Sequence, residues 1–368
     1  MRWLFFVGCV LVFHGAAAQK FNNWSIETSL HFGRIVRHTP KITIPIEHYT
    51  LGGEVSAECH LRRRAWHKWA GYPRMGVALS YQNFGDLRRI GQGFGVIPHV
   101  SMDFVRTRGD VFRLYGRLGL GFGYLTRHYE LPDNPDNNIV GSHFGNNTSL
   151  RLTAEIRLNR FWRLRPSATF THYSNAASQL PNFGINVASA QLGLCYSPDY
   201  ISHDSLRRRD AESVSMLGYV DTLRPAHRRR WMFSVQAGMG VRESQTYGGP
   251  KYATAAASIE AGKFVSNIHR LRAGVEWEYI GSTHAFLQNL HNYTAQEALW
   301  QAMRISAVAG FEITWGRLSL GGIIGVYLTN NELQPKRFYF RPTARYYFFT
   351  PPFSPKRNIC EPYVMIGL

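Results

Sequence analysis

Apolar and polar residues alternate along much of this chain, and this alternation constrains its fold more than any other feature. The segments 112–124, 148–159, 270–279 and 337–348 show it most clearly. In 148–159, leucine, alanine and isoleucine occupy every second position, and charged or polar residues occupy the positions between. A period of two places successive side chains on opposite faces of a β-strand, whereas a helix needs a period near 3.6. The sequence therefore predicts an all-β protein, with no helices.

The length and chemistry of these segments indicate which kind of β-protein this is. Strands of about ten residues with one apolar and one charged face are typical of a transmembrane antiparallel β-barrel, whose apolar side chains face lipid. A soluble β-sandwich also alternates, but it rarely combines so many long strands with aromatic ends. We expect one barrel of about 12–16 strands. The expected strands are 24–34, 48–59, 75–84, 92–105, 111–126, 147–159, 162–174, 184–196, 230–242, 251–265, 269–281, 301–315, 317–329 and 336–349, with the tail 359–368 beginning another.

The N-terminus has the pattern of a cleaved export signal. Met1-Arg2 precedes an apolar run from Trp3 to Phe13, and Ala16-Ala17-Ala18 matches a small-residue cleavage site. The run is too short for a membrane helix, which needs about 20 apolar residues. We predict a signal peptide over 1–18 and one outer-membrane β-barrel domain over 19–368, located in the outer membrane of a Gram-negative bacterium.

Basic residues outnumber acidic residues by 42 to 24, so the formal net charge is +18. The export signal argues against nucleic acid as a partner. Arginine binds phosphate and carboxylate bidentately, so an anionic lipid or glycolipid surface is the expected partner. The alternative is that arginine fills a polar barrel interior opposite glutamate. The basic stretch 198–229 has no assigned role, and the oligomeric state is not predicted. Cysteine and histidine show no metal-ligand spacing, so neither a metal nor a cofactor is expected.

One pair of polar residues interrupts an apolar face. His172 and Ser174 lie two residues apart on an expected strand, so both point to the same side as Phe170. Asn186, on the next expected strand, also belongs to the apolar face, and the hairpin brings the three together. Two interpretations remain open. The residues lie in the headgroup region, where polarity is tolerated, or His172 is a general base that activates Ser174 while Asn186 orients the imidazole.

The run His172-Tyr173-Ser174-Asn175-Ala176, with Pro181-Asn182 and Gly184-Ile185 after it, resembles the active-site segment of the PagL family of lipid A 3-O-deacylases. Members of that family are outer-membrane β-barrel esterases that remove the 3-position acyl chain of lipid A. The resemblance implies that His172 is the catalytic base and Ser174 the nucleophile. It also implies that Asn175 and the backbone of Ala177 contribute to the oxyanion hole, and that lipid A, within lipopolysaccharide, is the partner.

The chain departs from the family at two points. Asn186 stands where the family has a glutamate. An asparagine can orient a histidine by accepting a hydrogen bond, but it cannot stabilise an imidazolium by charge. The chain is also roughly twice as long as the small eight-stranded barrels typical of the family. The sequence predicts an esterase that deacylates lipid A; a non-catalytic barrel, porin-like or structural, that contacts lipopolysaccharide is the alternative.

Overall fold

The computed structural model describes residues 24–62, 65–198, 205, 231–243, 247–266, 268–290, 292–329, 337–348 and 362–367. Most of these residues form β-strands, so the all-β prediction is confirmed. The predicted signal peptide and nearly all of the basic stretch 198–229 lie outside the described residues. The chain divides into two units, Met1–Tyr219 and Val220–Leu368.

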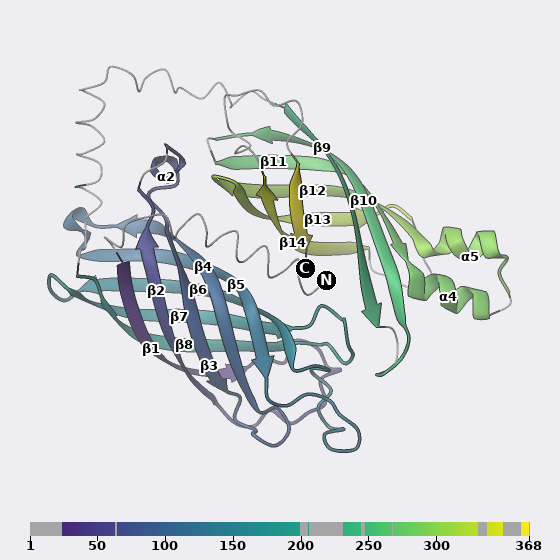
Figure 1. Cartoon of the computed structure of the whole chain (residues 1–368), viewed down its shortest axis with the longest axis horizontal. Coiled ribbons are helices and arrows are strands. Elements are labelled where there is room, and N and C mark those ends of the chain that lie inside the picture. The colour runs from purple at the N-terminus through teal and green to yellow at the C-terminus, as the bar shows by residue number, and fades with distance from the viewer. Residues whose placement is uncertain are drawn as a thin grey trace. The chain divides into compact units, whose positions relative to one another are not determined.

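In the first unit, eight antiparallel strands close into a barrel (Figure 1). Each strand pairs with its neighbour in the sequence, and β1 pairs with β8 to complete the ring. A short helix, α2, spans Ala65–Trp69 between β2 and β3. The strands are β1 (Trp24–Ile35), β2 (Thr50–His60), β3 (Arg74–Asn83), β4 (Gln92–Arg106), β5 (Phe112–Leu125), β6 (Phe144–Arg157), β7 (Trp162–Ser174) and β8 (Ile185–Tyr196).

The alternation predicted from the sequence is the alternation between the lumen and the outside of this barrel. On β7, Arg163 and Arg165 are buried inside, whereas Phe170 is exposed on the outer face. Strand β8 follows the same rule, with Val187 buried and Leu192 exposed. The period of two therefore assigned each of these side chains to its face correctly.

Ion pairs fill much of the lumen. Arg165 donates hydrogen bonds to Glu27, Glu58 and Glu155 at 2.7, 2.7 and 2.8 Å. Arg117 holds both carboxylate oxygens of Glu54 at 2.7 Å. Removing such charges from water is unfavourable unless each is paired and hydrogen-bonded, and here each carboxylate contacts at least one arginine. These arginines fill the polar interior of the barrel opposite glutamate, which is the alternative to binding an anionic lipid surface.

Apolar side chains close the lumen near the end that carries the 36–49 and 126–143 loops. They come from strand ends and from the loops between them, and they form one buried cluster. Its members are Ile35, Ile42, Ile44, Phe84, Ile90, Leu125, Ile139, Val140, Tyr173, Ile185 and Val187. A packed apolar cluster above a network of ion pairs makes the interior of this barrel a core and not an aqueous channel.

Gly33 permits the close approach of β1 and β8 where the barrel closes. A Cβ atom at this position would lie 2.6 Å from the Cβ of Ser189 and would clash with the backbone oxygen of Ala188. Gly33→Ala is therefore expected to lower the free energy of unfolding by about 1–3 kcal/mol. Urea unfolding in detergent micelles, followed by tryptophan fluorescence, measures this change. Gly53→Ala, on the neighbouring strand β2, is the control: its φ is not positive, and a Cβ there would meet only Ser29 O at 3.5 Å and Leu30 Cδ2 at 4.0 Å, which are ordinary contacts. Equal stability of Gly33→Ala and the wild type would contradict the prediction.

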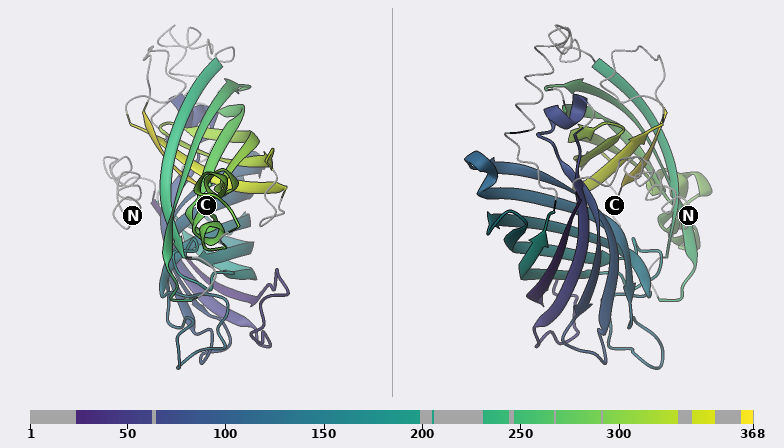
Figure 2. Two further views of the ribbon diagram at one scale, coloured as in Figure 1. Left: turned by 90° about the vertical axis from the view of Figure 1, so that its right-hand side faces the viewer. Right: turned by 60° about the vertical axis from the view of Figure 1, so that its left-hand side comes forward.

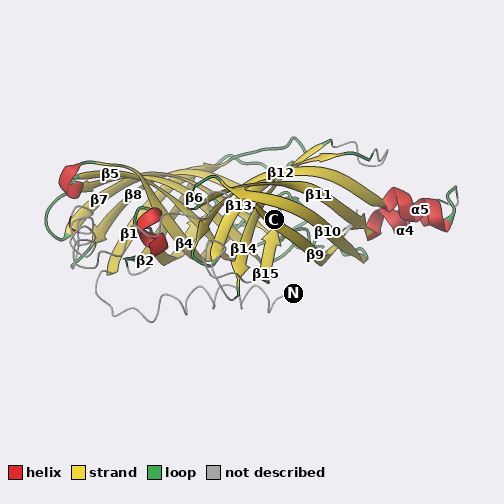
Figure 3. Ribbon diagram, turned by 90° about the horizontal axis from the view of Figure 1, so that it is seen from above, coloured by secondary structure: helices red, strands yellow, loops and turns green. Residues whose placement is uncertain are grey.

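The second unit contains a separate antiparallel sheet of seven strands, in the order β15-β14-β13-β12-β11-β10-β9. Figure 2 shows the curvature of the sheets from two further directions. Two helices, α4 (Gly281–Asn289) and α5 (Ala295–Ala302), connect β11 to β12 (Figure 3). The strands are β9 (Trp231–Glu243), β10 (Lys251–Phe264), β11 (His269–Ile280), β12 (Met303–Trp315), β13 (Leu318–Tyr327), β14 (Phe338–Tyr347) and β15 (Tyr363–Gly367).

The fifteen strands of the described residues fall within the predicted range, but they do not form the single barrel expected over 19–368. Strand β8 returns to pair with β1, so the first sheet closes before β9 begins. Alternation is a property of each strand alone and is the same for one large barrel and for two sheets, which is why the sequence did not distinguish them.

The expectation of no helices was wrong for α4 and α5, and also for the single short turn of α2. Thr294 caps α5, because its hydroxyl accepts from the Glu297 amide at 3.3 Å while the Glu297 carboxylate accepts from the Thr294 amide at 2.8 Å. This capping box satisfies donors that a helix start leaves unpaired. No helix in the described ranges combines the length and the apolar character required to cross a membrane.

One face of the second sheet carries its own buried ion cluster. Glu312 accepts from Arg270 at 2.6 Å and from Arg345 at 3.1 Å. Glu260 accepts from Arg345 at 2.7 Å and from Arg272 at 3.0 Å. The arginines of β11 and β14 are thus paired with the glutamates of β10 and β12 on one face of the sheet.

Candidate active site

The hairpin between β7 and β8 brings the three polar residues predicted for the site together on the outer face of the barrel. His172 pairs directly with Asn186 in the strand register. Ser174 is the last residue of β7, two positions beyond His172. All three side chains are half-buried, and they continue the outward-facing row that contains Phe170. The same-face arrangement predicted from the period of two is therefore present.

Asn186 sets the orientation of the His172 ring. The Asn186 Oδ1 atom lies 2.6 Å from His172 Nδ1. Because a carbonyl oxygen can only accept, this contact places the imidazole proton on Nδ1 and leaves Nε2 with the lone pair that a general base needs. Gly184 makes room for the ring: its backbone φ is +80°, and a Cβ atom there would lie 2.7 Å from His172 Cε1.

Asn182 and the backbone after Ser174 hold the Ser174 hydroxyl. The Asn182 Nδ2 and Oδ1 atoms lie 3.1 and 3.2 Å from Ser174 Oγ. The Ala176 amide also donates to this oxygen at 3.3 Å. Reaction through His172 requires the hydroxyl to rotate from Asn182 toward His172 Nε2. Asn182 stood in the recognisable motif of the sequence, but its contact with Ser174 was not predicted.

Asn175 braces the hairpin loop. Its backbone amide donates to Asn182 Oδ1 at 3.0 Å, and its side-chain Nδ2 donates to Ser142 Oγ at 2.9 Å and to the Gln179 carbonyl at 2.7 Å. These bonds tie the β7–β8 hairpin to the loop that precedes β6. The predicted part of Asn175 in an oxyanion hole remains a prediction.

The two alanines that follow have an unusual backbone. Ala176 and Ala177 have φ angles of +55° and +57°, in the left-handed region that residues with a Cβ rarely adopt. This turn points the Ala176 amide back at Ser174 Oγ. Strained backbone of this kind is concentrated at functional sites, where it aims specific groups. The contribution of the Ala177 backbone to an oxyanion hole remains a prediction.

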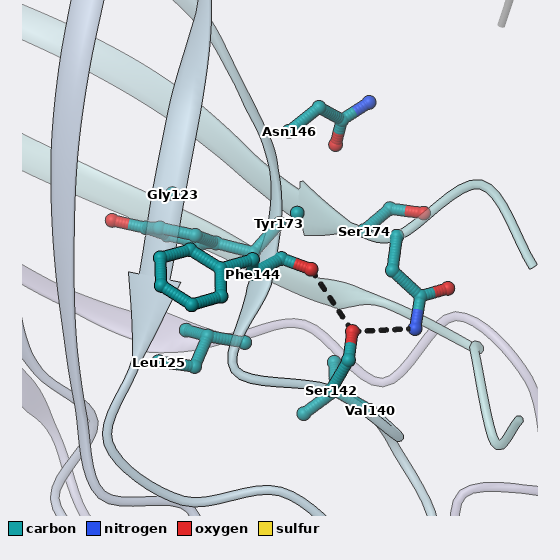
Figure 4. Close-up of a pocket in the computed structure, with 10 residues that line it drawn as sticks. Gly123, Leu125, Val140, Ser142, Phe144, Asn146, Tyr173 and Ser174 are labelled. Atoms are coloured by element: carbon teal, nitrogen blue, oxygen red, sulfur yellow. Dashed lines mark hydrogen bonds between the residues drawn. The ribbon is translucent and has the colours of Figure 1, made fainter. Parts of the chain in front are cut away.

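A small pocket lies beside Ser174 (Figure 4). Figure 4 shows the Ser142 hydroxyl, which donates to the Phe144 carbonyl at 2.9 Å. The same hydroxyl accepts from Asn175 Nδ2 at 2.9 Å. Apolar and aromatic side chains form much of the wall next to the serine. The lining residues are Gly123, Leu125, Val140, Ser142, Phe144, Gly145, Asn146, Tyr173, Ser174 and Asn175.

The arrangement is suited to acyl transfer. It contains a serine hydroxyl, an imidazole whose Nε2 is left with a lone pair, and a third residue that orients the imidazole, which are the kinds of group that acyl transfer by a serine uses. Among the described residues, no group of three or more His, Cys, Asp or Glu side chains is placed to hold a metal ion. Two further contacts at the site were not predicted from the sequence: Ser142 with Asn175, and His38 with Asn186. Both Ser142 and His38 come from loops distant in the sequence, so no local pattern could have identified them.

Two family models match the chain. Residues 51–194 match the model described as lipid A 3-O-deacylase (PagL). Residues 230–353 match the model described as acyloxyacyl hydrolase, C-terminal domain. The first match contains His172, Ser174 and Asn186, and the second includes strands β9 to β14 and helices α4 and α5. No curated protein matches the sequence.

Several solved structures are similar to part of the chain. The outer membrane enzyme PagL has 15% sequence identity and a TM-score of 0.32, and the match covers 45% of this chain and 97% of that one. Neisserial surface protein A has 9% identity and a TM-score of 0.31, covering 47% of this chain and 96% of that one. The N-terminal β-barrel domain of Pseudomonas aeruginosa OprF has 14% identity and a TM-score of 0.28, covering 47% and 96%.

Proposed function

This chain belongs to the PagL family of lipid A 3-O-deacylases, and from that premise we propose that it removes an acyl chain from lipid A with Ser174 as nucleophile and His172 as base. As a member of this family it is an ester hydrolase of the Gram-negative outer membrane. The observation that carries the proposal is the 2.6 Å contact between Asn186 Oδ1 and His172 Nδ1, two residues from Ser174 on the outer face of the barrel.

The proposed reaction has two steps. In the first, His172 Nε2 takes the Ser174 proton as Oγ attacks the ester carbonyl carbon of the acyl chain. The tetrahedral intermediate then collapses, His172 protonates the departing sugar oxygen, and the acyl group remains on Ser174. In the second step, water attacks the acyl-serine with His172 again as base, which releases the fatty acid and restores the serine hydroxyl.

The position of the site supports a lipid substrate. His172 and Ser174 follow Phe170 on the face that turns away from the lumen, so an acyl ester in the surrounding lipid can reach them without entering the barrel. Polar side chains on a lipid-facing surface are unfavourable and are commonly functional. Exposed Arg34 and Arg37 follow along the neighbouring strand β1 and its loop, and arginine suits the phosphates of an anionic glycolipid.

A passive pore is the competing function, and the interior of the first unit argues against it. The ion pairs around Glu27, Glu54 and Glu155 and the apolar cluster above them occupy the lumen of the closed barrel. Small barrels of eight strands are just wide enough for side chains to fill them. The proposal therefore assigns the chemistry to the outer wall and a structural role to the interior.

The direct test is the mass spectrum of lipid A from a Gram-negative host that expresses the full chain. We expect lipid A to lose the mass of one ester-linked acyl chain, with release of the matching free fatty acid. Lipid A from the same host carrying an empty vector provides the baseline. Unchanged lipid A in a host whose membranes contain the folded protein would contradict the proposed activity on that lipid A.

Asn186→Glu is expected to raise kcat by about ten- to a hundredfold, because a carboxylate would stabilise the imidazolium that forms as His172 takes the proton. The ring orientation is unchanged in this variant, since a carboxylate oxygen can also accept from Nδ1. Initial rates of fatty acid release from purified lipid A in mixed micelles measure the effect. Asn186→Gln has the same length without the charge, and an equal gain in this control would show that charge is not the cause.

A further inference from the structure

We propose that His38 is a positioning residue that fixes the direction of the Asn186 side-chain amide and, through it, the tautomer of His172. Asn186 contacts two imidazoles at once. Its Oδ1 lies 2.6 Å from His172 Nδ1, and its Nδ2 lies 2.8 Å from His38 Nδ1. This inference rests on the proposed function, because it concerns the base of that reaction.

An asparagine side chain differs from a carboxylate because its two terminal atoms, Oδ1 and Nδ2, are not equivalent: the first accepts a hydrogen bond and the second donates one. With Oδ1 toward His172, the proton of that ring is on Nδ1 and Nε2 is free to accept the proton of Ser174. With the amide reversed, Nδ2 would donate to His172 Nδ1, which would move the ring proton to Nε2 and leave no base facing the serine. A glutamate carries the same acceptor on both oxygens and has no such wrong orientation.

His38 selects the productive orientation. In the neutral ring with its proton on Nε2, the Nδ1 atom can only accept, so it attracts the NH₂ end of Asn186 and repels the carbonyl end. The carbonyl is thereby directed to His172. In this chain His38 and Asn186 together orient the His172 ring, which a single carboxylate could do alone.

The backbone holds His38 beside Asn186. The Val36 amide donates to the Asn186 carbonyl oxygen at 2.7 Å, which continues the β1–β8 ladder past the end of β1. The Arg37 guanidinium donates to the Ile44 carbonyl at 3.1 Å, and that of Arg34 donates to the Ile46 carbonyl at 3.3 Å. These bonds anchor the loop on both sides of His38, although the His38 side chain itself is exposed.

A double-mutant cycle in the full chain tests the inference. We expect His38→Ala to lower kcat for fatty acid release about tenfold with KM unchanged, as for the loss of one orienting hydrogen bond. In the Asn186→Glu background, the same substitution is expected to change kcat by less than about twofold, because no amide remains to be oriented. His38→Asn, whose Oδ1 can accept in place of Nδ1, should restore at least half of the activity. The control is His48→Ala, an exposed histidine of the same loop.

A second measurement does not depend on turnover. The ¹⁵N chemical shifts of the His172 ring report which nitrogen carries the proton. We expect protonated Nδ1 in the wild type and a mixture of the two tautomers in His38→Ala. An equal loss of kcat in both backgrounds, or an unchanged tautomer in His38→Ala, would overturn the role of His38. An inactive wild type with the expected tautomer change would instead contradict the proposed esterase and leave the positioning role supported.

Discussion

Ser174→Ala is expected to reduce the rate of lipid A deacylation by about a thousandfold or more, because the variant lacks the oxygen that forms the acyl-enzyme. The alanine retains the backbone of β7 and the Ala176 turn, so the loss is one of chemistry. Release of fatty acid from purified lipid A measures the rate in vitro, and the mass spectrum of lipid A measures it in the membrane. His172→Ala should produce a loss of similar size, since nucleophile and base act as one unit.

The matched control for this prediction is Ser178→Ala. Ser178 is an exposed serine in the same hairpin loop, and its backbone amide donates to the Asn175 carbonyl at 3.2 Å, a bond that alanine preserves. It should retain the activity of the wild type. The heat-dependent shift in electrophoretic mobility that folded outer-membrane barrels commonly show would verify folding of each variant. Identical lipid A from wild type and a folded Ser174→Ala variant would exclude Ser174 as the nucleophile.

The second large effect concerns stability. Glu155→Ala is expected to lower the free energy of unfolding of the first unit by about 3–5 kcal/mol, because it leaves buried guanidinium groups without a counter-charge. Arg165 contacts Glu155 Oε2 at 2.7 and 2.8 Å, and Arg113 donates to Oε1 at 2.9 Å. Arg74 and Arg163 lie within 3.6 Å of the same carboxylate. Urea unfolding in lipid vesicles or detergent measures the change.

Glu47→Ala is the control for the loss of a glutamate. Glu47 is exposed in the loop after β1, so its removal should change the free energy of unfolding little. The free energy of unfolding of Glu155→Gln should lie between those of Glu155→Ala and Glu47→Ala, since an amide keeps part of the hydrogen bonding without the charge. A Glu155→Ala barrel as stable as the wild type would contradict the prediction, because it would show that the buried arginines do not need Glu155 as a counter-charge.

The strands and their faces could be predicted from the sequence because both depend on local properties. Each expected strand overlaps an observed strand, and on β7 the lumen-facing Arg163 and Arg165 and the outward Phe170 follow from a period of two. The short helices α4 and α5 escaped prediction, since each is too short to show a long periodic pattern, and only α5 has a side-chain cap, from Thr294. Closure between β8 and β1 also escaped it, because every strand of the chain alternates alike and the partner of an edge strand is set by the whole sheet.

The same division applies to the site. Strand periodicity and hairpin pairing are local, so the sequence alone could predict that His172 and Ser174 share a face and that Asn186 joins them across the 175–184 hairpin. The groups that surround these three residues come from distant parts of the chain and depend on the tertiary fold. His38 meets Asn186 across 148 residues of sequence, and Ser142 meets Asn175 across 33. The contact between His38 and Asn186 forms because β1 pairs with β8 when the barrel closes, and the contact between Ser142 and Asn175 forms because neighbouring loops pack together. Both contacts depend on the free energy of the assembled sheet, which no single segment of the chain provides.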